Sequence, residues 1–554
     1  MDNDIVLRGG MVVDGTGAVG FEADVAVKDG RISAIGKGLS GIRELDASGQ
    51  IVCPGFIDIH THYDAQVFWD PALSPSSAHG VTSVVAGNCG FSIAPVHADG
   101  VDLLAHTLQH VEDMSFDTLA AGVPWDEFET FPQYLDAVER HGMSLNFGCY
   151  VGHTAIRLYA MGDEAYERPA TPTELDNMAG LVDGAMAAGA LGFASSWAPT
   201  HRGDKGRPVP SRVADFAEVA ALMEPLRTRN KGVVALLPGG AMANDAMFDL
   251  QRHIGRPFTW TALLTMAGSD RHKDVMAEHA EARATGVDVW PQVSCRPLIF
   301  QLTMLEPFTF NPWPNFAALM DRPIDERIAA YRDQSWRDST WDQFQGGLSQ
   351  MLNWSSMAVA ESAKRPDLIG RSIAELAEEQ SITPLDVMLD VALSDDLMTR
   401  FSSVVANSDP EGIAFLLQRD DVLLGLADSG AHVSQLCDAC FATDLLGNWV
   451  REREVMPIEK AVHKLTGEPA AVYDLSDRGV LEVGRAADVV VFDPETVAPG
   501  PLRRVVDFPA NGERLTADAP VGMTHTLVNG VPIRIDGSAD PEGFNKRAGT
   551  LLRS

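Results

Sequence analysis

The stretch PGFIDIHTHYDAQ, residues 54–66, places two histidines, His60 and His62, at the end of an apolar run. Residues i and i+2 of a β-strand point to the same face, so the two imidazoles project together, about 6.6 Å apart along the backbone. That spacing suits two ring nitrogens that bind one metal ion. Tyr63 and Asp64 follow directly, so we expect a polar site past the carboxyl end of a buried strand. The alternative is a pair of surface histidines on a loop.

The size and composition of the chain limit what it binds. Its 554 residues predict two or three domains, and 45% hydrophobic with 22% charged residues is typical of a globular protein. A formal net charge of −34 argues against nucleic acid and against an anionic membrane surface, since both require basic patches. The sequence shows no long apolar run and no signal peptide, and six scattered cysteines favour reduced thiols. We therefore expect a cytoplasmic protein that acts on a small molecule, with a homo-oligomer left open.

Strand-like and helix-like segments alternate through most of the chain after about residue 80. Strands separated by helices pair in parallel with right-handed crossovers. The apolar run QIVCPGFIDIH predicts one continuous strand that ends at His60, and with it eight strand candidates are enough to close a (β/α)8 TIM barrel, an α/β fold, over residues 56–476. The other seven candidates are GVTSVVAGNCG, SLNFGCYVGH, GALGFASS, KGVVALLPG, FTWTALLTM, GVDVWPQVS and VLLGLADSG.

The two ends of the chain read as β-structure. Alternating segments with Gly turns in residues 1–55 and 477–554 predict a β-sandwich built from both termini. Residues 302–350 interrupt the βα alternation with segments rich in aromatic residues and proline, such as EPFTFNPWPNF. We interpret this stretch as an insertion that either covers the barrel mouth as a substrate lid or packs on the outside.

Polar residues at the carboxyl ends of parallel strands are candidates for chemistry, because barrel enzymes build their sites there. Cys89, in VVAGNCG, offers a thiolate ligand or is a buried structural thiol. Asp428, in GLADSG, has two interpretations: it binds a metal and transfers protons, or its side chain only caps the N-terminus of a helix. His153, in YVGHTAIR, is expected to polarise a substrate carbonyl or to bind metal. The alternative is a core histidine whose ring nitrogens are hydrogen-bonded within the protein.

These residues together resemble the metal-dependent amidohydrolase superfamily, and more narrowly its N-acyl-D-amino-acid deacylase (D-aminoacylase) branch. PGFIDIHTHYD paired with GRAADVVVFDP is specific for the superfamily, and GNCG points to the deacylase branch. The resemblance implies that His60 and His62 ligate a divalent ion with Cys89 as a ligand or bridge. It also implies that Asp428 is both a ligand and the general base.

The sequence departs from the family in its metal ligands. The deacylases supply two further histidines from the next barrel strands, and the matching segments GVVALLPGGA and FTWTALLTMAG contain none. His253 and His272 lie nearby but outside those strand ends. We therefore expect one ion, Zn²⁺ or another divalent metal.

The carboxylate of an acylated amino acid needs a cationic partner. The Gly- and Arg-rich segment THRGDKGRPVPSR follows a strand and suits that role, although an ordinary solvated loop explains it as well. The candidate substrate-binding residues are Arg207, Arg212, Arg296 and Tyr63, with Arg157 and Arg202 as further arginines.

The resulting prediction is an amidohydrolase that acts on a carbon–nitrogen bond other than a peptide bond. A metal-activated hydroxide attacks a carbonyl that the metal or His153 polarises, and Asp428 is the general base and then the acid. Two alternatives remain: the same fold acting on a cyclic amide, an ester or lactone, or an activated C–C bond, and a metal-poor pseudoenzyme.

Overall fold

The computed structural model describes residues 3–239, 242–305, 307, 310, 312–319, 322–346 and 353–554. They divide into two compact units. Unit 1 comprises residues 1–264, 270–296 and 411–554, and unit 2 comprises residues 265–269 and 297–410.

Unit 1 is built around an eight-stranded sheet in which every neighbouring pair is parallel. All eight predicted strands occur in it, side by side in sequence order. Beyond β6 and β16, the two edge strands, a parallel bridge joins Thr61 to Ser429. The strands are β6 (Phe56–Asp58), β7 (Val81–Ala86), β8 (Asn146–Gly152), β9 (Gly192–Ser196), β10 (Val233–Leu237), β11 (Phe258–Trp260), β12 (Val289–Val293) and β16 (Leu423–Leu424).

The residues of these strands suit a sheet that is covered on both faces. Every residue of β7, β8 and β9 is buried, which is why their sequences are nearly continuous apolar runs rather than alternating ones. The continuous strand expected to end at His60 is wrong, because the run divides at Gly55 into β5 (Ile51–Pro54) and β6, which belong to different sheets. A Cβ on Gly55 would lie 2.1 Å from the Thr82 hydroxyl oxygen, so the close approach requires glycine.

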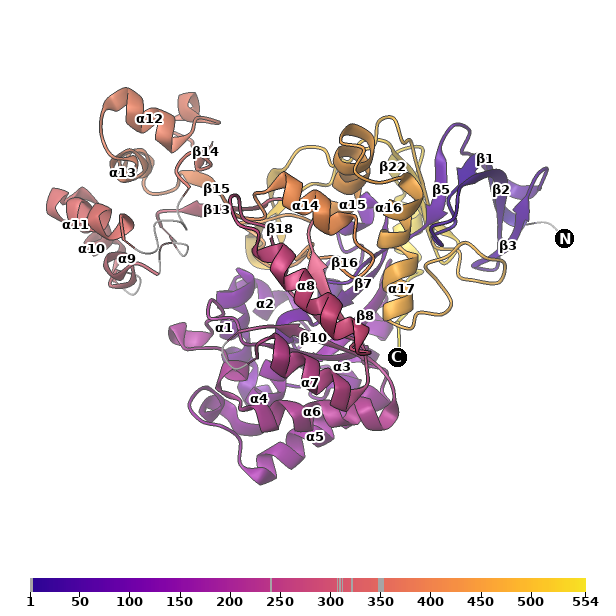
Figure 1. The fold of residues 1–554 in the computed structure, drawn as a ribbon, viewed down its shortest axis with the longest axis horizontal. Helices are drawn as coiled ribbons and strands as arrows, with labels where there is room; N and C mark the ends of the chain where they lie inside the picture. The colour runs from indigo at the N-terminus through magenta and orange to yellow at the C-terminus, as the bar shows by residue number, and fades with distance from the viewer. Residues whose placement is uncertain are drawn as a thin grey trace. The chain divides into compact units, whose positions relative to one another are not determined.

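Helices alternate with the strands of unit 1 (Figure 1). Helix α5, for example, begins with a capping box between Thr171 and Glu174 and a proline in its first turn. The helices of this unit are α1 (Val101–Glu112), α2 (Phe116–Gly122), α3 (Phe131–His141), α4 (His153–Met161), α5 (Pro172–Ala187), α6 (Phe216–Arg229), α7 (Asn244–Ile254), α8 (Arg271–Ala284), α14 (Pro410–Leu417), α15 (Phe441–Asp444), a π-helix (Leu445–Glu452), α16 (Ile458–Leu465), α17 (Gly467–Val472) and α18 (Pro541–Asn545).

Strands from both termini form a second, nine-stranded sheet in unit 1. Its strands are β1 (Asn3–Val12), β2 (Phe21–Lys28), β3 (Arg31–Gly36), β4 (Gly41–Asp46), β5, β17 (Val489–Phe492), β20 (Met523–Val528), β21 (Val531–Ile535) and β22 (Ser538–Ala539). A separate hairpin pairs β18 (Arg503–Phe508) with β19 (Gly512–Thr516). The termini therefore build one β-structure, as expected, while its two layers stay a prediction.

Unit 2 has a core of its own, formed by aromatic and aliphatic residues such as Phe310, Trp313 and Phe344. It is larger than the predicted insertion at 302–350, part of which falls outside the described residues. Its strands β13 and β15 are antiparallel neighbours, with Leu298 opposite Ala406. The elements are β13 (Leu298–Thr303), α9 (Pro314–Ala317), α10 (Ile324–Arg332), α11 (Gln334–Phe344), β14 (Ala358–Glu361), α12 (Ile373–Gln380), α13 (Pro384–Ser394) and β15 (Arg400–Ala406).

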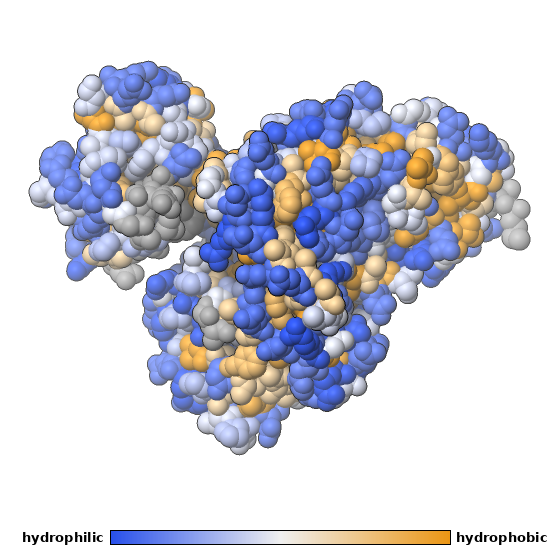
Figure 2. All heavy atoms as spheres, viewed as in Figure 1, coloured by the Kyte–Doolittle hydropathy of each residue, from blue (hydrophilic) through white to orange (hydrophobic). Residues whose placement is uncertain are grey.

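The molecular surface is mainly hydrophilic on the face drawn in Figure 2, and apolar side chains gather near the N-terminal strands. Val19 and Phe21 are exposed there. Within the described ranges, no helix combines the length and the apolar character needed to cross a membrane.

Candidate metal centre

The two histidines of the opening motif lie just past the carboxyl end of β6 and face two other predicted ligands. Asp428, which follows β16, places its Oδ1 3.3 Å from His60 Nε2 and 3.1 Å from His62 Nε2. Cys89, in the turn after β7, places its Sγ 3.7 Å from His60 Nε2. The ligand atoms of His60, His62 and Cys89 all lie within 4.8 Å of one another. The structure therefore clusters His60, His62 and Cys89 and places Asp428 against the two histidines, beside the Thr61–Ser429 bridge.

Three residues that the sequence did not single out orient the imidazoles. His60 Nδ1 lies 2.7 Å from the side-chain oxygen of Gln292 and 3.1 Å from the hydroxyl of Thr261. His62 Nδ1 lies 3.0 Å from the carboxylate of Glu112, at the end of α1. When Nδ1 donates its proton to these oxygens, the lone pair of each Nε2 faces this cluster.

The strand-end rule points to two of these three residues. Gln292 lies near the carboxyl end of β12 and Thr261 directly follows β11, where barrel enzymes place functional side chains. Glu112 lies in a helix far from any strand end, so no local signal identifies it.

The electrostatics of the cluster reflect two acids facing two imidazoles. Burial alone would lower the pKa of His60, but its bonds to Asp428 and Cys89 raise that pKa to about 10. Burial alone would raise the pKa values of Cys89 and Asp428, but the hydrogen bonds of both groups to the histidines lower them. Two imidazole nitrogens, a thiolate and a carboxylate form a donor set that Zn²⁺ prefers, and a bound ion would replace the protons on the histidines.

A protein-family model described as "Amidohydrolase family" matches residues 43–534. The chain belongs to the amidohydrolase family. Its sequence is 29% identical to an N-acyl-D-glutamate deacylase of Alcaligenes xylosoxydans xylosoxydans, over 96% of this chain and 93% of the relative. It is 28% identical to a D-aminoacylase of the same organism, over 96% of this chain and 94% of that protein.

Solved structures of the same branch of amidohydrolases share the fold. A D-aminoacylase with a binuclear metal centre is 27% identical and has a TM-score of 0.68, with complete coverage of both chains. An N-acyl-D-glutamate deacylase from Bordetella bronchiseptica, complexed with zinc and a phosphonate inhibitor, is 25% identical with a TM-score of 0.66 and complete coverage of both chains. These likenesses confirm the predicted D-aminoacylase branch of the amidohydrolases.

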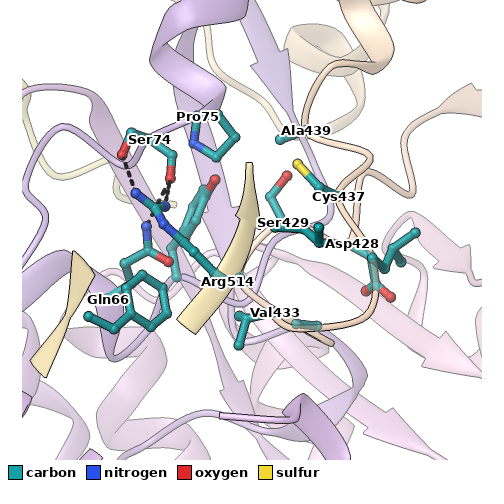
Figure 3. A pocket seen from close by; sticks show the side chains of 15 residues that line it. Gln66, Ser74, Pro75, Asp428, Ser429, Val433, Cys437, Ala439 and Arg514 are labelled. Carbon is teal, nitrogen blue, oxygen red and sulfur yellow. Dashed lines mark hydrogen bonds between the residues drawn. The ribbon is translucent and has the colours of Figure 1, made fainter. Parts of the chain in front are cut away.

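A pocket of about 300 Å³ opens beside Asp428 (Figure 3). Asp428, Ser429 and Cys437 lie on one side of it and Arg514 on the other. The guanidinium of Arg514 is already bound by the carboxylate of Asp507 and by Ser74. The lining is otherwise neutral, and much of it is apolar.

A second pocket, of about 260 Å³, adjoins the Nδ1 side of His62. Glu112 and Asp64 line it together with Phe91, Ile93 and other apolar side chains. His62 lines this second pocket, whereas Asp428 lines the first.

The predicted substrate-binding residues are engaged in bonds within the protein. Tyr63 lines the pocket beside Asp428, but its buried hydroxyl bonds Ser76. Arg207 pairs with Asp163 and Asp204. Their roles toward a substrate carboxylate stay predictions.

The other two arginines are held in the same way. Arg212 donates to the backbone carbonyls of Pro199 and His201. Arg296 pairs with Asp438 at 2.7 Å and with Asp444 at 3.1 Å. Because these guanidinium groups already have partners, a substrate that binds them has to compete with the bonds present here.

His153 is fully buried at the start of α4. Its Nδ1 lies 2.7 Å from the Ser195 hydroxyl and its Nε2 lies 2.9 Å from the Glu218 carboxylate. Both ring nitrogens therefore have partners, which favours the core histidine among the alternatives. The catalytic role of His153 stays a prediction. His432, by contrast, lies at the centre, with Nε2 3.9 Å from Asp428 Oδ2.

Proposed function

We propose that this amidohydrolase hydrolyses the amide C–N bond of an N-acyl-D-amino acid or a closely related amide. One Zn²⁺ ion would be held by His60, His62, Cys89 and Asp428. The observation that carries the proposal is the cluster of His60, His62 and Cys89, whose ligand atoms lie within 4.8 Å of one another, with the carboxylate of Asp428 against both histidines. The relatives named for deacylation of D-amino acids support the substrate class.

The residues divide the chemistry among them. Zinc in this position supplies Lewis-acid chemistry, which polarises a carbonyl and acidifies water. Asp428 lines the pocket and contacts both histidines through Oδ1, so its Oδ2 is placed to accept the proton of the attacking water and return it to the leaving nitrogen. Gln292 would accept the Nδ1 proton of His60, and the carboxylate of Glu112 lies 3.0 Å from Nδ1 of His62, so each ring would present Nε2 to a bound ion.

A single ion is the simplest occupancy. Strands β10 and β11 end at Leu237 and Trp260, where the family supplies further histidine ligands. The next residue, Thr261, bonds both His60 and Gln292. Leu237, Trp260 and Thr261 therefore add neither a further imidazole nor a charged group for a second cation.

The architecture proposed with this function is a complete (β/α)8 barrel over residues 56–476 and a two-layered β-sandwich from 1–55 and 477–554. The bridge between Thr61 and Ser429 supports closure of the barrel. We further propose a cytoplasmic location, which the six free cysteines support, and a small-molecule substrate, with the homo-oligomer left as a prediction.

The test compares Asp428→Asn with wild type on a panel of N-acyl-D-amino acids, cyclic imides and aryl esters. Asp428→Asn should lower kcat at least a hundredfold while the fold persists. Asp474→Asn is the matched control, since Asp474 is an exposed aspartate that shares the left-handed backbone of Asp428. Near-normal turnover by Asp428→Asn, or turnover of esters alone by the wild type, contradicts the proposal.

A further inference from the structure

We infer that Asn88 is a positioning residue that fixes the sulfur of Cys89 against the two histidines. The inference rests on the proposed function, in which Cys89 is a metal ligand. The turn that carries Cys89 has an unusual backbone, with positive φ angles at Gly87 (78°), Cys89 (55°) and Gly90 (80°). A cysteine persists in the left-handed region only when its surroundings hold it there.

The side chain of Asn88 supplies this restraint. Its amide nitrogen lies 2.9 Å from the carbonyl oxygen of Val85 and 3.3 Å from those of Ile59 and Thr61. Ile59 and Thr61 flank His60 in the chain, so one buried amide ties the turn of Cys89 to the segment that bears the histidines. Asn88 is 1% exposed and is not among the residues lining either pocket, so it acts through Cys89 and not on a substrate.

A second attachment holds the turn from its other side. The backbone N–H of Gly87 donates to the carboxylate of Asp64 at 2.9 Å. Asp64 also accepts from the thiol of Cys149 at 3.3 Å and is buried. The two residues that precede Cys89 are therefore both anchored to residues 59–64, and the 3.7 Å between Cys89 Sγ and His60 Nε2 follows from these anchors.

The alternative is that Asn88 only stabilises the fold. Asn146, the first residue of β8, is the matched control, because it is also buried and donates to Thr82 and Ser83 of β7 and to Asp488, which precedes β17. If Asn88 positions the sulfur, its loss alters the metal centre. If it only stabilises, Asn88→Ala and Asn146→Ala behave alike.

The experiment measures zinc affinity by chelator competition and the thiolate-to-cobalt charge-transfer absorption of the Co²⁺-substituted full chain. Asn88→Ala should weaken zinc binding about 10- to 100-fold and diminish the absorption, and Asn88→Ser, which keeps one donor, should fall in between. Asn146→Ala should lower the melting temperature and leave the absorption unchanged.

The outcomes separate this inference from the proposed function. An unchanged affinity and absorption in Asn88→Ala and Asn88→Ser, or equal losses in Asn146→Ala, overturn the positioning role. A wild-type protein without the absorption, whose zinc content is the same after Cys89→Ser, overturns the metal role of Cys89 itself. If Asn88→Ala does not fold, Asn88→Ser carries the same comparison.

Discussion

Replacing Glu218 by glutamine should destabilise unit 1 by about 3 kcal/mol at neutral pH and leave zinc binding intact. Glu218 is buried, and its two oxygens lie 2.5 and 2.6 Å from Arg157 Nη1. One of them also meets His153 Nε2 at 2.9 Å. Glutamine keeps the size of the side chain and removes its charge, so the guanidinium of Arg157 stays buried without a counter-ion.

The magnitude follows from the electrostatics of the cluster. Burial alone would raise the pKa of Glu218, but the bonds to His153 and Arg157 lower it from 4.5 to about 2. That difference corresponds to roughly 3 kcal/mol, and breaking a buried ion pair costs about 3–5 kcal/mol in other proteins. Because the folded pKa is the lower one, this stability is present above about pH 4.5 and is lost as the pH falls towards about 2. The free energies of unfolding of wild type and variant should therefore become equal at acidic pH.

The assay is hydrogen exchange of peptides from α4 and α6, with peptides of unit 2 as the internal reference, together with thermal unfolding at neutral and acidic pH. Asp183→Asn is the control, since it breaks the exposed pair with Arg229 and should change stability by less than about 1 kcal/mol. Unchanged protection of the α4 and α6 peptides from hydrogen exchange in Glu218→Gln would refute the stabilising role of this ion pair. If Glu218→Gln kept its full stability but lost turnover, that result would support a catalytic role for His153.

Further predictions concern the metal centre and the second unit. Gln292→Leu should lower zinc affinity about 10- to 100-fold in a chelator competition, because His60 loses the acceptor that fixes its ring, and an unchanged affinity would contradict that role. Glu112→Ala should weaken zinc binding more than Glu112→Gln, which keeps an acceptor near His62; the reverse order in the same titration would speak against it. A chain in which a short Gly-Ser linker replaces residues 297–410 should fold and bind one zinc per chain by atomic emission, because the four ligands and their outer partners all belong to unit 1.

Local patterns predicted the strands of the parallel sheet and the residues that lie together at the candidate metal centre. The eight strands of the parallel sheet are predicted from the sequence because a strand covered on both faces is an apolar run wherever it occurs. His60 and His62 are recognisable because two residues two apart share a face, and Cys89 and Asp428 because they follow strands. The apolar run before His60 led to the wrong prediction of one continuous strand, because apolar character alone does not reveal that Gly55 divides the run between two sheets.

The features that the sequence did not reveal depend on tertiary packing. Glu112, the last residue of α1, reaches His62 from a helix 50 residues further along the chain. Helices α12 and α13 have the same apolar periodicity as barrel helices, but they pack in the separate core of unit 2. Their spacing alone therefore did not show that the insertion extends to about residue 410.

The bridge between Thr61 and Ser429 joins the segments that follow β6 and β16, the two edge strands of the eight-stranded parallel sheet. His60 and His62 follow β6, and Asp428 follows β16. A single bound cation would therefore cross-link the first strand of this sheet to the last. Removal of the cation by chelation would break this cross-link, and faster proteolysis near residues 60 and 428 would report the loss before the rest of the molecule opens.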